Sequence, residues 1–135
     1  VSDFDISIPE FEADSEQLTQ VVLNVVRNAA QALAGVPDPQ IRLETRVARG
    51  VTLAKKRHRL ALALSITDNG PGVPDAIRER IFYPLVSGRD GGSGLGLTIA
   101  QTFVAQHNGT IEWTSKPGHT VFTILLPLEM TRGPA

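Results

Sequence analysis

The sequence predicts an α/β protein with two layers, in which helices lie on one face of a mixed or antiparallel sheet. Three segments have a helical pattern and about five have the pattern of strands, in the order β-α-β-β-α-α-β-β. A doubly wound parallel fold would alternate strands and helices, and this order does not. Because 135 residues is the size of one domain, we expect a single domain over residues 1–135, with three helices covering the sheet.

The first half of the chain is predicted to hold a strand, a long helix and a pair of strands. Residues 4–8 alternate apolar and polar side chains, which is typical of a short edge strand. Apolar residues recur at helical spacing over residues 15–34, and the Gly-Val-Pro-Asp-Pro stretch that follows ends this helix. Residues 41–47 alternate as a strand, and the more apolar residues 60–67 predict a second, more central strand.

The segment between these two strands, residues 49–59, is strongly basic. It contains the run Lys55-Lys56-Arg57-His58-Arg59. A basic patch for a partner and a solvated hairpin tip would both account for this run. We favour the hairpin tip.

The second half is predicted to hold two helices followed by two strands. Residues 74–82 form a short helix, with the proline at its start suited to the first turn. Residues 94–107 form the third helix, which an Asn-Gly pair ends. Residues 110–114 and 120–126 are strands joined by a Lys-Pro-Gly turn.

Composition excludes several classes of protein. The chain has no cysteine, so it can form neither a disulfide nor a thiolate metal site, and its net charge of −1 gives no broad electrostatic reason to bind nucleic acid. It has no signal-peptide pattern and no apolar run near the length of about 20 residues that a membrane span needs. We therefore expect a soluble, cytoplasmic protein. The chain begins with Val1, so we expect it to be a fragment of a longer protein.

A glycine-rich stretch precedes the third predicted helix. Four glycines fall within six residues before an apolar run. Glycine backbone can approach a ligand closely, and the free N–H groups of a helix beginning near Gly94 or Leu95 would favour an anion. The stretch is therefore compatible with a mobile phosphate cradle, and equally with a flexible surface loop before a core helix.

Polar amides share one face of the long first helix. Asn24, Asn28 and Gln31 are spaced at i, i+4 and i+7 on a helix otherwise rich in valine and alanine. An asparagine carbonyl oxygen is a hard neutral ligand suited to Mg²⁺, which usually keeps several waters and bridges to substrate phosphates. The alternative is that these amides cap backbone groups of the sheet or face solvent.

A carboxylate and two glycines follow the apolar strand, in the sequence Asp68-Asn69-Gly70-Pro71-Gly72. A carboxylate at the edge of a sheet can accept a hydrogen bond from an exocyclic amine, and glycines allow a flat base to approach the backbone. Asp-Asn-Gly is equally a turn sequence.

The three motifs follow one another in one short chain, and here the sequence resembles a known family. It is similar to the ATP-binding catalytic domain of sensor histidine kinases, in the superfamily that includes gyrase B, Hsp90 and MutL. The resemblance places an N box at residues 24–29, a first glycine box at 68–72, an F box at 81–85, a second glycine box at 92–96 and a last glycine-and-threonine element at 118–122.

This resemblance implies a Bergerat-type fold that binds Mg-ATP. It also implies that the γ-phosphate is donated to a histidine on a separate dimerisation domain, which leaves ADP. Residues 26–33, 82–89 and 106–109 further resemble the sensor kinases of nitrogen regulation. That likeness implies a two-component system with a response regulator of the NtrC type and a PII signal protein as partners, and we expect the isolated domain to be a monomer.

The resemblance also implies roles for individual residues. Asn28 would coordinate Mg²⁺ and would form the catalytic set with Asn24 and Arg89. Asp68 would bind the adenine amine, and Thr120 would support the adenine pocket. The implied ATP-binding residues are Asn28, Gln31, Asp68, Gly70, Gly72, Phe82, Arg89, Gly92, Ser93, Gly94, Leu95, Gly96, Leu97 and Thr120.

The chain departs from the family pattern at two places. Many histidine kinases carry lysine where this chain has Gln31, and Thr-Thr-Lys where it has Ser87-Gly88-Arg89. Arg89 is therefore expected to meet the phosphate charge in place of the missing helix lysine.

Two other functions remain possible at this point. A stand-alone ATPase of the gyrase and Hsp90 type would place a glutamate as general base where this chain has Asn24, and an amide has no useful basicity. A regulatory docking module for a PII protein, with nucleotide serving only as a signal, is the other alternative. None of His58, His107 and His119 lies in the sequence context of a phosphoacceptor, so we expect no acceptor histidine in this chain.

Overall fold

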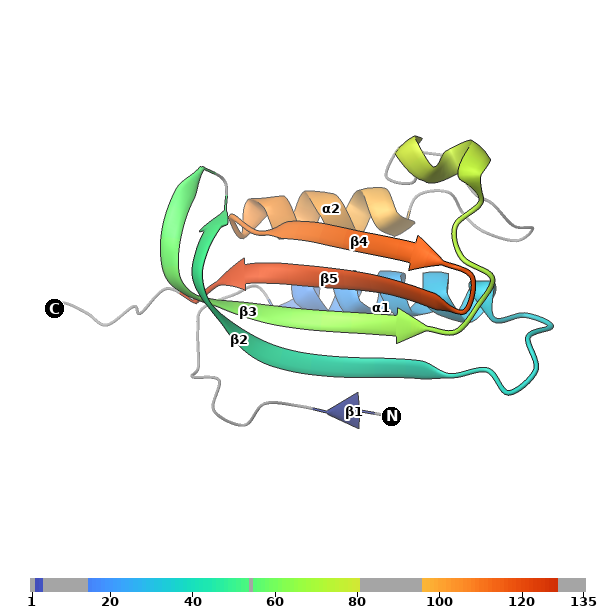
Figure 1. Ribbon diagram of the computed structural model, residues 1–135. Helices are drawn as coiled ribbons and strands as arrows, with labels where there is room; N and C mark the ends of the chain where they lie inside the picture. Colours follow the sequence, from blue (N-terminus) through green and yellow to red (C-terminus); the bar gives the residue numbers. More distant parts are fainter. Residues whose placement is uncertain (1, 4–14, 54, 81–95, 129–135) are drawn as a thin grey trace, which may run out of the picture.

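The computed structural model describes residues 2–3, 15–53, 55–80 and 96–128, and these build a sheet with helices against one face (Figure 1). The strand order is β1-β2-β3-β5-β4. The strands β2, β3, β5 and β4 pair antiparallel, whereas β1 runs parallel to β2. Their bounds are Ser2–Asp3 for β1, Ile41–Leu53 for β2, Lys56–Asp68 for β3, Thr110–Lys116 for β4 and His119–Pro127 for β5. The predicted strand at residues 4–8 lies outside the described residues.

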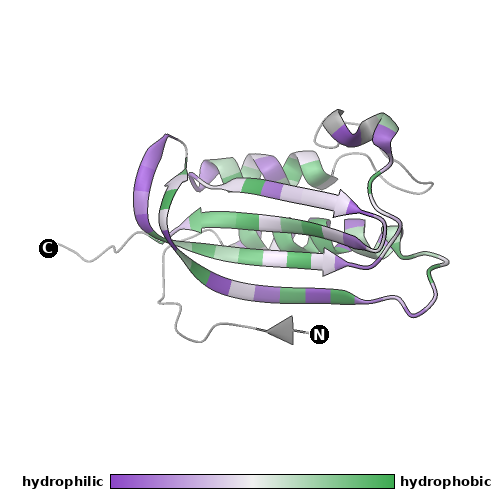
Figure 2. Cartoon of the chain, viewed as in Figure 1, coloured by the Kyte–Doolittle hydropathy of each residue, from purple (hydrophilic) through white to green (hydrophobic). Residues whose placement is uncertain are grey.

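Two α-helices form the second layer, α1 over Ser15–Ala32 and α2 over Gly96–Gln106. The valine and alanine stripe of α1 faces the sheet, as its spacing predicts. Alternate residues of β3 and β5 meet it, because successive side chains of a strand point to opposite faces. Figure 2 shows β5 and the part of β3 that pairs with it as largely hydrophobic. The buried core consists of Val21, Val25, Ala29, Ile66, Ala100, Val104, Phe122, Ile124 and Leu126. The predicted two-layer α/β arrangement is confirmed.

The prediction of three helices over the sheet is wrong in one respect. The segment Asp75–Arg80 is a 3₁₀ helix, η1, which lies beyond the end of β4 rather than in the helical layer (Figure 1). Four of its six residues are charged, so it has no apolar stripe to bury against the sheet. It contacts the sheet at its edge instead, where the Arg78 guanidinium lies 5.0 Å from the centre of the Trp113 ring.

The β2–β3 hairpin is longer than the sequence predicts. We expected residues 49–59 to form a solvated tip, but β2 continues to Leu53 and β3 begins at Lys56. The cause is a second apolar cluster, in which Leu53, Ala61 and Leu125 are buried. Because Ala61 and Leu125 alternate with core residues, this cluster lies on the sheet face that the helices do not cover. The hairpin therefore curls over that face (Figure 1).

Candidate nucleotide site

The carboxylate of Asp68 is placed at the end of β3, opposite Thr120 of β5. The two residues are register partners, and each is 4% exposed. The Asp68 Oδ1 atom accepts a hydrogen bond of 2.9 Å from the Gly70 N–H, which orients the carboxylate. A nearly buried carboxylate at a strand end can accept a hydrogen bond from a ligand amine that reaches it.

The two glycines after Asp68 allow the backbone to pass close to its neighbours. A Cβ atom on Gly70 would lie 3.0 Å from both the Ala32 carbonyl oxygen and Asp68 Oδ1, so a larger residue would crowd α1 and the carboxylate. Gly72 has a φ of +93°, in the region that L side chains rarely adopt. The backbone conformation therefore favours glycine at Gly72, and close packing favours it at Gly70.

Ser115 connects this segment to β4 and β5, and the sequence analysis did not identify it. Its Oγ accepts a hydrogen bond of 2.8 Å from the Val73 N–H and lies 2.8 Å from Thr120 Oγ1. The Gly118 N–H donates to the Gly70 carbonyl at 2.8 Å. The role of Ser115 depends on its register with Thr120, so no local signal could have revealed it.

Helix α1 bridges the two glycine segments of the predicted site. The Asn24 Nδ2 donates to the Gly96 carbonyl at 3.1 Å, and its Oδ1 accepts from Gln20 Nε2 at 2.7 Å. Two helical turns later, Ala32 contacts Gly70. Asn28 is half-buried between them on the same face, about 6 Å along the helix from each.

The remaining predicted residues divide into three groups. Gly96 begins α2 beside Asn24, and Leu97 is half-buried against the core. Gln31 is exposed on α1. The other predicted members lie outside the described residues and stay predictions, namely Phe82, Arg89, Gly92, Ser93, Gly94 and Leu95.

The donor chemistry of the site suits a metal held mostly by water and phosphate. In the described part of the chain, no three His, Cys, Asp or Glu residues are grouped closely enough to hold a metal ion. Mg²⁺ at phosphate sites commonly takes only one or two protein ligands. The half-buried amide of Asn28 therefore fits as a single neutral oxygen ligand.

Comparison with known proteins assigns the chain to one family. Residues 13–130 match the family of histidine kinase-, DNA gyrase B- and HSP90-like ATPases, and the chain belongs to that family. The resemblance found in the sequence motifs is thereby confirmed.

Curated relatives within this family carry one name. The chain is 52% identical over 128 residues to the sensory histidine kinase/phosphatase NtrB of Klebsiella oxytoca. It is 42% identical over 131 residues to the protein of the same name from Rhodobacter capsulatus. Each match covers 95% of this chain and 36% of the relative, so the chain spans just over a third of their length.

Solved structures of histidine kinase domains have the same fold. The catalytic domain of the histidine kinase ThkA superposes with a TM-score of 0.72 at 25% identity, over 94% of this chain and 76% of that one. The histidine kinase domain of the E. coli osmosensor EnvZ gives 0.66 at 25% identity, over 99% of this chain and 78% of that one. No helix within the described ranges is long and apolar enough to cross a membrane.

Proposed function

We propose that this chain is the catalytic domain of a sensor histidine kinase of nitrogen regulation, which binds Mg-ATP and presents the γ-phosphate to a histidine on another domain of its parent protein. The observation that carries the proposal is the placement of Asp68. Its side chain is buried at 4% exposure, accepts a hydrogen bond from the Gly70 N–H, and lies opposite Thr120. The family match over residues 13–130 and the NtrB relatives support it.

The adenine end of the nucleotide is assigned to the strand ends. Asp68 accepts a hydrogen bond from the exocyclic amine of adenine. Gly70 and Gly72, which carry no side chains, present their backbone to the base. The hydrogen bonds of Ser115 to Thr120 and to Val73 support this pocket from β4 and β5.

The phosphate end is assigned to α1 and to the beginning of α2. Asn28 holds Mg²⁺, which neutralises phosphate charge when it is bound. Helix α2 begins at Gly96, whose carbonyl accepts the hydrogen bond from Asn24, so its first N–H groups lie beside α1. These groups and the positive end of the helix dipole favour phosphate oxygens. Arg89 and residues 92–95 complete this end of the site in the proposal.

Phosphoryl transfer needs positioning and charge neutralisation more than covalent participation by the protein. Asn24 cannot act as the general base of a stand-alone ATPase, and its amide is engaged with Gln20 and with the Gly96 carbonyl. Its role is to hold α1 against α2. We therefore favour transfer to a histidine over direct hydrolysis, with a response regulator of the NtrC type and a PII protein as partners of the parent.

Calorimetric titration with ATP and with GTP tests the base assignment. Guanine presents a carbonyl oxygen where adenine presents its amine, so the Asp68 carboxylate would face a second acceptor. We expect GTP to bind at least about tenfold more weakly than ATP. Equal affinities would overturn the assignment of Asp68 to the base.

A further inference from the structure

The end of the β2–β3 hairpin carries a dense group of exposed cations. We call residues 49–59 the basic hairpin; it contains five of the thirteen Lys and Arg residues of the chain and none of its fourteen acidic residues. The remainder of the chain therefore carries eight cations against fourteen acidic residues. Figure 2 shows this end of the hairpin as hydrophilic. The five exposed cations are Arg49, Lys55, Lys56, Arg57 and Arg59.

The basic hairpin is held in a fixed place by its own apolar residues. Leu53 is 3% exposed and packs with Ala61 and Leu125. Strand pairing continues to the last possible pair, Leu53 with Lys56. The cations are therefore carried by paired strands anchored on the sheet rather than by a loose loop.

These cations are not neutralised within the described residues. The ion pairs there join Arg42 and Arg46 to Glu44, and none involves residues 49–59. Like charges at this density repel one another, and an opposite charge from a partner relieves that repulsion.

We propose that the basic hairpin is a docking surface for an acidic patch on a partner protein. Charge complementarity favours this occupant over an extended polyanion, because the rest of the chain is acidic and repels nucleic acid and anionic membranes at longer range. Residues 49–59 contain no aromatic side chain on which a base could stack. Leu53 points into the cluster, so it is not available as a membrane wedge.

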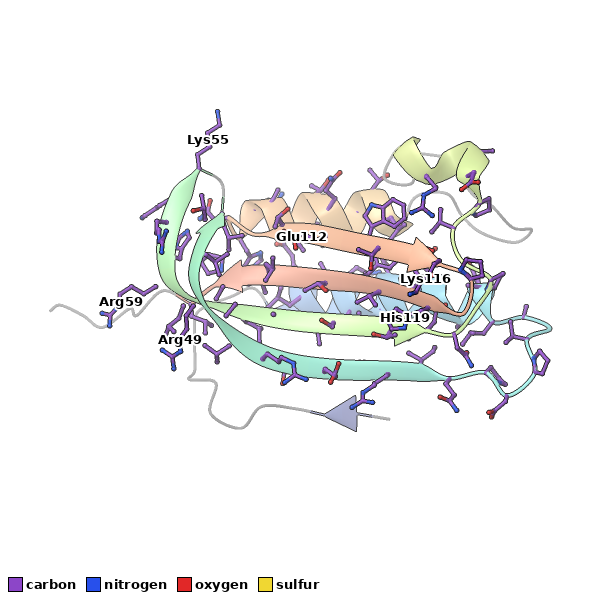
Figure 3. All side chains as sticks on the ribbon, viewed as in Figure 1. Arg49, Lys55, Arg59, Glu112, Lys116 and His119 are labelled. Atoms are coloured by element: carbon purple, nitrogen blue, oxygen red, sulfur yellow. The ribbon has the colours of Figure 1, made fainter. Side chains whose placement is uncertain are left out.

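This surface lies far from the candidate nucleotide site. Lys56 and Asp68 are the two ends of the 13-residue strand β3, which would span about 40 Å if fully extended and spans less here because the hairpin curls. Figure 3 shows Arg49, Lys55 and Arg59 at one end of the sheet and Lys116 and His119 at the other. A protein docked on the basic hairpin therefore leaves the nucleotide site open, and the two can be occupied together.

Binding of the full chain to a labelled peptide rich in Glu and Asp tests the proposal, measured by fluorescence anisotropy. Lys56→Glu should weaken binding about fivefold, and Lys56→Glu with Arg59→Glu should weaken it further. Lys116→Glu is the matched control, since Lys116 is also an exposed lysine next to a two-residue turn and the change in net charge is the same. This control should bind like the parent sequence, and added salt should weaken all binding.

Three results would overturn the proposal. One is the absence of peptide binding, and another is an equal loss in Lys56→Glu and Lys116→Glu. The third is tighter binding, dependent on the basic hairpin, to a DNA duplex or to phosphatidylserine vesicles than to the acidic peptide. Thermal unfolding of each variant shows whether weaker peptide binding comes from the changed surface charge or from loss of the folded structure. ATP binding is measured on the same variants. If it is unchanged where peptide binding is lost, the loss belongs to the basic hairpin and not to the nucleotide site.

Discussion

Asp68 is the residue on which recognition of the base depends most directly. A carboxylate that is only 4% exposed needs polar partners, and the Gly70 N–H is one of them. Because the carboxylate is already oriented before a ligand arrives, little side-chain freedom is lost when an amine binds to it.

Replacing Asp68 with alanine should weaken ATP and ADP alike, because both carry the same base. The loss of a hydrogen bond to a charged group is about 1.5 to 3 kcal/mol, or roughly tenfold to a hundredfold in dissociation constant. Calorimetry on the two nucleotides measures it, with Glu112→Ala as a control at an exposed carboxylate on β4. Unchanged affinity in a folded Asp68→Ala protein would contradict the assignment.

Asn28→Ala should show a different dependence, because a metal ligand matters only when the metal is present. We expect a large loss of ATP affinity with Mg²⁺ and a small loss in chelator. Thr19→Ala, at an exposed position on the same helix and outside the expected ATP-binding residues, is the comparison. Equal losses in the two conditions would instead identify Asn28 as a structural amide.

At this scale the sequence reveals residues whose chemistry is local. Asp68 next to two glycines and Asn28 on an apolar helix could be singled out as candidates because their residue types are unusual for their positions, and their roles stay predictions. The hydrogen bond from Asn24 to the Gly96 carbonyl and the contacts of Ser115 could not be recognised. Each depends on how segments far apart in the chain are brought together.

Among the elements, the β2–β3 hairpin shows where sequence periodicity is insufficient. The α1 helix was predicted to end within two residues of its observed end, since a regular stripe of valine and alanine defines it. The outer part of the hairpin was missed, because basic residues there obscure the alternation. Its burial comes from Leu125 of β5, which no local pattern reports.

The hairpin cluster should therefore contribute measurably to stability. Leu53→Ala removes a side chain that is 3% exposed and should lower the free energy of unfolding by about 2 kcal/mol, at the low end for a core leucine because the cluster is small. Leu23→Ala, on a side chain 43% exposed, should change it by less than about 0.5 kcal/mol. Urea unfolding of both proteins makes the comparison, and equal changes would show that the cluster is not a packed unit.

At the scale of the whole molecule, we propose that ATP binds to this domain and that the acceptor histidine lies on another domain, which gives a further prediction. A phosphoacceptor histidine must come within roughly 3 to 3.5 Å of the γ-phosphorus. His58 is 8% exposed near the far end of the sheet, and the Nδ1 of His107 lies 2.9 Å from the Phe103 carbonyl oxygen at the end of α2. His119 is exposed beside the β4–β5 turn.

We expect the purified chain to acquire no acid-labile phosphohistidine from γ-labelled ATP. Label should appear only on an added fragment of the parent that carries the helical hairpin with the acceptor histidine. Incubation with and without that fragment, followed by acid treatment, measures the transfer. Label mapped to His58, His107 or His119 of this chain alone would contradict the proposed division of work.

The position of β5 in the sheet affects how the molecule can be assembled. It is the last strand among the described residues, yet it lies between β3 and β4 and pairs with both. During synthesis β3 and β4 therefore lack their shared neighbour until residues 119–127 have left the ribosome. Since the sheet closes through contacts of high sequence separation, folding should be slow for a chain of this size, and its half-finished form exposes unpaired strand edges to aggregation and to chaperones.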